Sequence, residues 1–199
     1  GGGRRDPLER LIRIMTTDVV VERDCRVAIV GFGTVGQAVA RLITGEAHPG
    51  VRLTHICNRQ IDRKKVEWVG GDVIWTESFD EVLASSVDVV IELIGGLAPA
   101  SAWIEQSLVA GKSVVTANKQ VIAESGAALQ RIAQRAGQEL LFEAAVAGGI
   151  PIVRGVREGL CGDRLSRIQG VLNGTCNYIL TEMQKNGRDF SDALGMAQD

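Results

Sequence analysis

The sequence has no long apolar run, few cysteines and few histidines, and each shortage excludes a class of protein. No stretch of the 199 residues approaches the run of about 18 uncharged apolar residues that indicates a membrane span. Arg10 and Arg13 interrupt the apolar residues near the N-terminus, so we expect no secretory signal, no membrane contact and a cytoplasmic location. The four cysteines form no CxxC pair and only two histidines accompany them, so we expect neither a disulfide framework nor a zinc site.

An excess of positive charge is also missing. The 22 Lys and Arg residues are balanced by 24 Asp and Glu residues, and aromatic residues make up only 4% of the chain. Nucleic-acid binding relies on basic surfaces and on aromatic side chains that stack on bases, so we expect no nucleic-acid partner. Glycine, by contrast, is abundant, and its 24 residues gather in a few clusters where the backbone must come close to another group.

From residue 26 onward, apolar runs alternate with amphipathic stretches. We predict strands at about residues 26–30, 51–57, 72–76, 87–94, 113–117 and 138–146. We predict helices between them, at about residues 34–44, 79–85, 99–110 and 119–136. Because strands alternate with helices and are nearly continuous in apolar residues, the pattern predicts an α/β fold with a doubly wound, Rossmann-type parallel sheet.

The pattern differs at both ends of the chain. Residues 1–24 open with three glycines and are interpreted as an N-terminal extension, and residues 25–147 as the α/β domain. Further along we predict a helix at about 150–159, a strand at 165–172, a helix at 175–186 and a helical segment at 189–199. Residues 148–199 are interpreted as the incomplete beginning of a second, α+β domain, because the sequence stops inside a helix without a stop signal.

Six residues between the first predicted strand and the first predicted helix form the pattern GxGxxG: Gly31, Phe32, Gly33, Thr34, Val35 and Gly36. In dinucleotide-binding folds the first glycine permits a tight turn, the second lets the backbone approach a pyrophosphate, and the third lets the helix pack on the strand. The N-terminus of the helix that follows supplies N–H groups and the positive end of a dipole. We therefore predict that this loop binds a dinucleotide; the alternative is a tight turn without a ligand.

The end of the second predicted strand bears on the choice of cofactor. NAD sites usually have Asp or Glu there to hold the ribose hydroxyls, whereas this strand ends in Asn58 and Arg59. A guanidinium suits the 2′-phosphate of NADP because its planar fork forms paired, charged hydrogen bonds. We expect NADP to be favoured, with NAD as the alternative cofactor. In the competing interpretation, Arg59 belongs to a solvated basic surface with Arg63, Lys64 and Lys65.

Two charged residues stand out near the carboxyl edge of the predicted sheet. Lys119 lies in the first helical turn after Asn118, a predicted N-cap. A cation there opposes the helix dipole, which indicates a use for the charge, although a lysine without function is an equal alternative. Glu143 lies in an otherwise apolar strand and needs a cation, a donor or a proton. With carbonyls of the AlaGlyGlyIle turn it is a candidate oxygen site for a hard cation; alternatively it caps a neighbouring loop or faces solvent.

A third polar cluster joins the strand predicted at 165–172 to the next helix. Asn173, Gly174 and Thr175 present N–H groups and a hydroxyl to a ligand carboxylate, or Thr175 simply caps the helix, which is the more common use. Cys176 has no basic residue beside it in sequence, so we expect a buried or semi-buried thiol and not a nucleophile.

Taken together, five segments resemble the homoserine dehydrogenase family. They are residues 31–36, 91–96, 111–119, 142–151 and 170–180, and the last three are not general features of Rossmann folds. The resemblance implies NAD(P)-linked interconversion of L-homoserine and L-aspartate 4-semialdehyde, on the pathway to threonine, isoleucine and methionine. It also implies a homodimer of the full-length protein, formed through the second domain, which makes residues 148–199 the start of a substrate-binding and dimerisation domain.

The resemblance also assigns roles to individual residues. It implies that Lys119 is a catalytic residue beside the nicotinamide and the substrate, and that Ile94 contacts the cofactor. It places Asn173, Gly174 and Thr175 at the substrate pocket.

A monovalent cation, usually sodium, is implied at Glu143 and at the carbonyls of Val146, Gly148 and Ile150. Cys176 departs from the threonine usual in the family's motif. The family's substrate-binding acids and a second lysine, regarded as the acid/base, follow the point where this sequence stops, so we expect a fragment or a truncated form. The competing hypothesis is a dinucleotide-binding module without turnover, and a third is another small-substrate oxidoreductase on the same scaffold.

Overall fold

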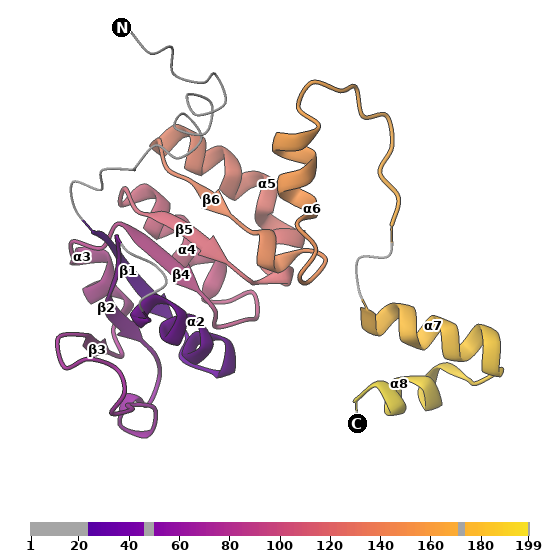
Figure 1. The fold of residues 1–199 in the computed structure, drawn as a ribbon, viewed down its shortest axis with the longest axis horizontal. Helices are drawn as coiled ribbons and strands as arrows, with labels where there is room; N and C mark the ends of the chain where they lie inside the picture. Colours follow the sequence, from indigo (N-terminus) through magenta and orange to yellow (C-terminus); the bar gives the residue numbers. More distant parts are fainter. Residues whose placement is uncertain (1–23, 46–49, 171–173, 199) are drawn as a thin grey trace, which may run out of the picture.

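The computed structural model describes residues 24–45, 50–170 and 174–198, and its centre is a six-stranded parallel sheet (Figure 1). The strands are β1 (Cys25–Val30), β2 (Val51–Cys57), β3 (Ile74–Thr76), β4 (Val89–Glu92), β5 (Ser113–Thr116) and β6 (Leu140–Leu141). Their order is β3-β2-β1-β4-β5-β6, and every pairing between neighbours is parallel. The chain moves outward from β1 in one direction and then continues from β4 in the other, so the strand order reverses between β1 and β4.

Helices connect the strands: α2 (Thr34–Thr44), α3 (Phe79–Ala84), α4 (Ala100–Val109) and α5 (Lys119–Ala136). The bounds of α2 and α5 match the predicted ranges, and the predicted α/β fold class is confirmed. Beyond the sheet come α6 (Ile152–Arg154), α7 (Gly174–Asn186) and α8 (Phe190–Gln198). Within the described residues, no helix is long and apolar enough to cross a membrane.

The alternation of side chains along the strands divides the core into two layers. On one face, Ile29 and Ile56 are fully buried with Phe32 and Ala40, which belong to the glycine loop and to α2. On the other face, strand residues pack with α3, α4 and α5; this layer includes Val30, Val90, Val114, Leu140, Phe79, Ile104, Leu108 and Leu129. Each such burial contributes about 1.5–3 kcal/mol, so the sheet is stabilised through its two faces.

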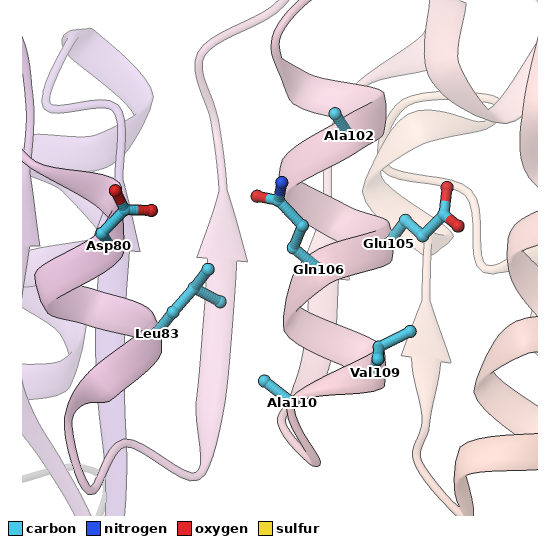
Figure 2. A pocket seen from close by; sticks show the side chains of 7 residues that line it. All are labelled: Asp80, Leu83, Ala102, Glu105, Gln106, Val109 and Ala110. Atoms are coloured by element: carbon cyan, nitrogen blue, oxygen red, sulfur yellow. The ribbon is translucent and has the colours of Figure 1, made fainter.

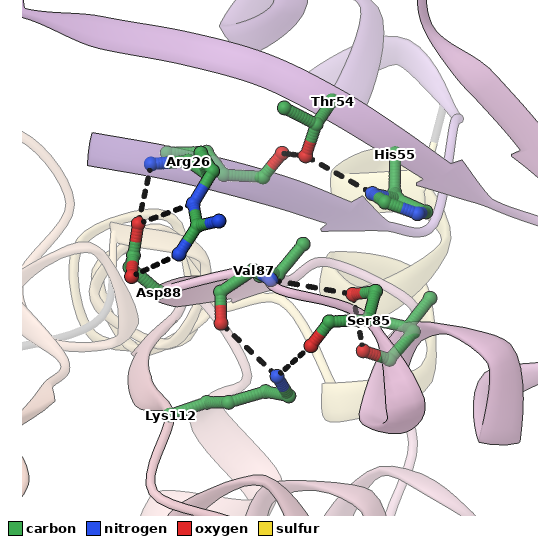
Figure 3. A network of polar contacts seen from close by, with 9 residues as sticks. Arg26, Thr54, His55, Ser85, Val87, Asp88 and Lys112 are labelled. Atoms are coloured by element: carbon green, nitrogen blue, oxygen red, sulfur yellow. Dashed lines mark hydrogen bonds and ion pairs between the residues drawn. The ribbon is translucent and has the colours of Figure 1, made fainter. Parts of the chain in front are cut away.

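A polar network closes the amino edge of the sheet (Figure 3). The Nζ of Lys112, a residue that is 5% exposed, donates hydrogen bonds to the carbonyls of Ser85 and Val87 at 2.7 and 3.0 Å. Burial lowers the pKa of Lys112. Arg26 binds the carboxylate of Asp88 through its backbone N–H at 2.9 Å and through its guanidinium at 3.1 Å. These bonds fix the segment that leads into β4.

The sixth strand is shorter than predicted. The sequence predicts a strand over 138–146, but only Leu140–Leu141 pairs with β5, and Glu143–Ala145 forms a 3₁₀ turn. The prediction that Glu143 lies within a strand is therefore wrong. The reason is its carboxylate, which accepts hydrogen bonds from the backbone N–H groups of Val153 and Arg154 at 3.0 and 2.8 Å. Those bonds join this part of the chain to α6 and not to β5.

The segment after the sheet differs from the prediction at one further place. The helix predicted at 150–159 is present as α6, continued by a π-helix over Gly155–Gly159. The strand predicted at 165–172 is wrong for its described residues, 165–170, all of which are exposed. A strand needs a neighbour to receive its backbone hydrogen bonds, and none of the described strands pairs with this segment.

The predicted terminal regions are described only in part. Residues 1–23 of the predicted N-terminal extension lie outside the described residues. At the other end, α7 packs against α8, and both lie away from the sheet in Figure 1. The predicted division of the chain after residue 147 stays a prediction.

Candidate dinucleotide site

The glycine loop between β1 and α2 has the geometry that a dinucleotide requires. Gly31 has a φ of +103°, and a Cβ atom on it would lie 2.7 Å from the backbone carbonyl carbon of Leu93. A Cβ atom on Gly36 would collide with the carbonyl oxygen of Gly31. In contrast, a Cβ atom on Gly33 would meet no protein atom within 4 Å. Packing thus requires the first and third glycines, whereas the space beside Gly33 is open to a ligand.

The N-terminus of α2 supplies hydrogen-bond donors beside that space. Its N-cap, Gly33, has no side chain to accept a hydrogen bond, and the N–H of Gln37 is bonded to the carbonyl of Gly33. The N–H groups of Thr34 and Val35 precede this bond and have no intrahelical acceptor, and both residues are exposed. Together with the positive end of the helix dipole, they form an anion site of the kind that binds a pyrophosphate.

Phe32 is turned into the protein. Its ring is fully buried, and the ring centroid lies 4.9 Å from that of Trp75 and 6.2 Å from that of Trp68. Its N–H donates a 2.9 Å hydrogen bond to the side-chain oxygen of Asn58. The ring and the N–H of Phe32 thus both have partners within the protein. The cofactor contact predicted for Phe32 would therefore have to use its carbonyl oxygen.

The end of β2 carries no acid and one exposed cation. The side-chain amide of Asn58 donates a 2.6 Å hydrogen bond to the carbonyl of Arg59. No ion pair in the described part of the chain includes Arg59, which is exposed. Its guanidinium can therefore receive an anion, beside three basic residues of the same loop: Arg63, Lys64 and Lys65.

On the other side of the strand-order reversal, Asn118 begins α5. Its side-chain oxygen accepts a 3.2 Å bond from the N–H of Val121, which confirms the predicted N-cap, and its amide donates to the carbonyl of Gly96 at 2.7 Å. Lys119 follows as the first residue of the helix and is exposed. Ile94, half-buried, follows β4, the strand between β1 and β5. The structure thus brings Lys119, Ile94 and the glycine loop to one edge of the sheet.

Glu92, the last residue of β4, is a buried acid that is not among the site residues predicted from the sequence. It is 1% exposed, and its carboxylate accepts hydrogen bonds from the N–H of Ile94 at 2.9 Å and from the hydroxyl of Thr116 at 2.5 Å. The Thr116 oxygen in turn accepts a 3.0 Å bond from the N–H of Asn118. The signal in the sequence is an acid inside the apolar run of residues 87–94.

The cation site predicted over residues 143–150 would use oxygen atoms alone as ligands. The half-buried carboxylate of Glu143 caps α6, so the capping alternative for this residue is present in the structure. Among the described residues, no three His, Cys, Asp or Glu side chains cluster, so a metal ion here would depend on one carboxylate and on backbone carbonyls. Such a donor set, with the carbonyls of Val146, Gly148 and Ile150, fits a hard cation.

Two of the three predicted substrate residues are described by the structure, and neither lies beside the glycine loop. Asn173 lies outside the described residues, and Gly174 and Thr175 are exposed at the start of α7, away from the sheet in Figure 1. Because α7 begins at Gly174, Thr175 lies inside its first turn, and the alternative that Thr175 is the N-cap is wrong. Cys176 is exposed, so the prediction of a buried or semi-buried thiol is wrong.

A separate surface groove of about 570 Å³ lies between α3 and α4 (Figure 2). Its lining residues are Asp80, Leu83, Ala102, Glu105, Gln106, Val109 and Ala110, and none of them is a predicted site residue. In contrast to this groove, the glycine loop combines open space, N–H donors and the reversal of strand order, where dinucleotides bind in such folds.

These features define a dinucleotide-binding domain of the doubly wound, Rossmann type. Residues 31–143 match the family model for the homoserine dehydrogenase NAD binding domain, and residues 151–199 match the model for homoserine dehydrogenase. The chain belongs to the homoserine dehydrogenase family, as its sequence motifs predict, and its sheet forms an NAD(P)-binding domain.

Named relatives and solved structures agree with this assignment. The homoserine dehydrogenase of Bacillus subtilis is 37% identical over 181 residues, covering 87% of this chain and 42% of the relative. The homoserine dehydrogenase of Pseudomonas aeruginosa is 39% identical over 180 residues, covering 87% of this chain and 41% of the relative. The crystal structure of a homoserine dehydrogenase from Thiobacillus denitrificans gives a TM-score of 0.77 at 38% identity, covering 88% of this chain and 42% of that one. The structure of a hyperthermophilic archaeal homoserine dehydrogenase in complex with NADPH gives a TM-score of 0.72 at 28% identity. This match covers 88% of this chain and 60% of that one. The chain spans about 42% of the length of the Bacillus subtilis relative.

Proposed function

We propose that this protein is an NADP-dependent oxidoreductase that interconverts L-homoserine and L-aspartate 4-semialdehyde in the biosynthesis of threonine, methionine and isoleucine. One observation carries the proposal: a glycine loop with an open anion site lies in a chain whose two parts match homoserine dehydrogenase. The proposal includes a small-molecule substrate, a homodimeric full-length protein and a cytoplasmic location.

The two halves of the cofactor lie on opposite sides of the glycine loop in this proposal. The N–H groups of Thr34 and Val35 bind the pyrophosphate. The adenosine half extends toward β2, where Arg59 receives the 2′-phosphate and no acid is present to hold a free 2′-hydroxyl, which favours NADP over NAD. The other half extends past Ile94 toward Lys119. When bound, the nicotinamide accepts or donates the hydride.

Lys119 is the proposed catalytic residue of this chain. Its ammonium is on the first turn of α5, at the edge where the substrate oxygen meets the nicotinamide half. A hydrogen bond from this ammonium holds the oxygen of homoserine in place and polarises the carbonyl of the semialdehyde. Asn118 fixes the backbone of Lys119 by capping the helix. Asn173, Gly174 and Thr175 are proposed to contribute N–H groups and a hydroxyl to the substrate pocket.

The test is the reduction of NADP by L-homoserine, followed by nicotinamide absorbance, with protein expressed from the complete reading frame. We expect turnover by the wild type and a loss of about 100-fold or more in kcat/KM for Lys119→Met. Lys185→Met, which removes an exposed lysine of α7, is the control and should retain activity. A wild type that binds NADPH but does not oxidise L-homoserine would be a binding module without this reaction.

We further propose that Glu143 and the carbonyls of Val146, Gly148 and Ile150 hold a monovalent cation, sodium. Thermal unfolding in sodium chloride and in choline chloride at equal ionic strength tests this, because choline is too large for a site of carbonyl oxygens. We expect sodium to stabilise the wild type and to have less effect on Glu143→Gln, which keeps an acceptor for α6 but has no charge. Equal stability of the wild type in the two salts would contradict the cation site.

A further inference from the structure

We propose that Glu92 is a positioning residue that builds the nicotinamide half of the site. Its buried carboxylate holds the loop after β4 and the start of α5, with Lys119, in one arrangement. The proposal rests on the proposed function and extends it to a residue that the sequence does not single out.

The side chain of Glu92 is buried in the protein. A carboxylate that is 1% exposed destabilises the fold unless donors or a cation satisfy it. Within the described residues, Glu92 takes part in no ion pair, and its bonds come from the N–H of Ile94 and the hydroxyl of Thr116. An apolar side chain of similar size, opposite Thr116 in β5, would fill the same space without that penalty. The acid is therefore explained by its two hydrogen bonds and not by packing.

One of the two bonds fixes a wall of the glycine loop. The backbone of Leu93 and Ile94 is the surface on which Gly31 packs, and a Cβ atom on Gly31 would lie 2.9 Å from the nitrogen of Ile94. The N–H of Leu93 bonds to the carbonyl of Val30 at 2.8 Å, and Glu92 takes the N–H of Ile94 that follows. The carboxylate thus sets the path of the chain as it leaves β4 and passes the cofactor.

The other bond leads to Lys119. Thr116 connects the carboxylate of Glu92 to the N–H of Asn118, and Asn118 caps α5 through the N–H of Val121. The amide of Asn118 also binds the carbonyl of Gly96, which belongs to the loop after β4. Carboxylate, hydroxyl and amide therefore form one connected set, with Lys119 as the next residue.

The adenosine half of the site is held by different bonds. There, Asn58 fixes the glycine loop through Phe32 and binds the carbonyl of Arg59. Among the described residues, no hydrogen bond joins these groups to Glu92, Thr116 or Asn118. Disturbing the bonds between Glu92, Thr116 and Asn118 should therefore weaken the binding of the nicotinamide half. The binding of the adenosine half should not change. A purely structural role would weaken both halves together.

The test compares NADPH with 2′,5′-ADP, which has the phosphorylated adenosine half and no nicotinamide. In Glu92→Gln, the Thr116 proton loses its charged acceptor; in Thr116→Val, Glu92 and Asn118 each lose a bond. We expect the Kd of NADPH to rise about tenfold in both variants, and the Kd of 2′,5′-ADP to change by less than about twofold. Thr116→Ser keeps the hydroxyl and should bind both ligands as the wild type does.

Lys112→Met is the matched control, because Lys112 is a buried polar residue at the other end of β5. It should lower the unfolding temperature and leave both Kd values within about twofold of the wild type. If Glu92→Gln does not fold, Thr116→Val decides. An equal loss for both ligands, or an unchanged Kd of NADPH in a folded variant, would overturn the role of Glu92. A wild type that binds neither ligand would instead overturn the proposed function.

Discussion

The side-chain oxygen of Asn58 holds the backbone N–H of Phe32 at 2.9 Å, so the residue that follows β2 fixes the glycine loop that follows β1. The nitrogen of the same side chain donates to the carbonyl of Arg59 at 2.6 Å. Asn satisfies both groups because it has an acceptor and a donor, whereas an ionised Asp has only acceptors. The position where NAD sites have an acid for the ribose is thus bonded to the protein's own backbone.

Asn58→Asp should change the cofactor preference. The variant keeps an acceptor for Phe32 but places a second oxygen against the carbonyl of Arg59, so that oxygen turns toward the ribose, where its charge repels a 2′-phosphate. We expect NADPH to bind about tenfold more weakly and NADH to bind at least as well as before. Fluorescence titrations with the two cofactors measure this.

The control for that experiment is Gln106→Glu, which adds the same charge in the groove between α3 and α4 shown in Figure 2. It should leave both affinities unchanged, because exposed charges are screened beyond about 10 Å. If the ratio of the two Kd values stays the same in Asn58→Asp, Asn58 does not restrict the choice of cofactor.

Gly36→Ala tests the close contact between β1 and α2. The added Cβ would collide with the carbonyl oxygen of Gly31, which belongs to the backbone and cannot move aside. We expect the free energy of unfolding to fall by about 1–3 kcal/mol or more, as urea unfolding would show. Gly126→Ala in α5 is the matched control, because its Cβ would meet a methyl group of Ile122 at 3.3 Å, which a shift of a few tenths of an ångström relieves. Alanine also favours the helix by up to about 1 kcal/mol, so similar stability losses in the two variants would contradict this packing.

His55 should make the stability depend on pH. Burial, and secondly the nearby charge of Lys112, lower the pKa of His55 from its ordinary value of 6.5, while Glu81 acts in the opposite direction. Below about pH 6.5 the unfolded chain therefore binds more protons than the folded chain, so stability falls as the pH drops. His55→Gln removes this contribution. Its unfolding temperature should therefore fall less than that of the wild type when the pH is lowered from about 7.5 to about 5.5. An identical loss in thermal unfolding of both proteins would assign the pH dependence to other groups.

Features that depend on neighbours in sequence were predicted correctly. The strand-loop-helix arrangement around the GxGxxG pattern and the N-cap at Asn118 are local, and both are present. The strand predicted at 138–146 is present only as β6, and the one predicted at 165–172 is wrong over its described residues 165–170. Strand formation depends on a pairing partner that the local pattern does not contain. For Glu143 the competing partners are N–H groups 10 and 11 residues further along the chain.

The parts of the candidate site that the sequence does not reveal depend on strand order. Glu92 and Thr116 are 24 residues apart, and Phe32 and Asn58 are 26 apart, so their bonds follow only once the neighbouring strands are known. An acid in an apolar run is a signal that Glu92 has a partner, but it does not identify that partner. The cofactor, substrate and cation roles of the individual residues stay predictions that the experiments above address.

The most direct test concerns the open space beside Gly33, where we place the pyrophosphate of NADPH. Gly33 has a φ of −83°, which alanine adopts readily, and its added Cβ would meet no protein atom within 4 Å, so Gly33→Ala should fold with an unchanged unfolding temperature. The measurement is a titration of both proteins with NADPH, followed by quenching of the fluorescence of Trp68 and Trp75, which lie against Phe32 of the glycine loop. We predict saturable binding by the wild type and binding at least about tenfold weaker by Gly33→Ala. Equal affinities of the two folded proteins for NADPH would contradict the placement of the cofactor at this loop.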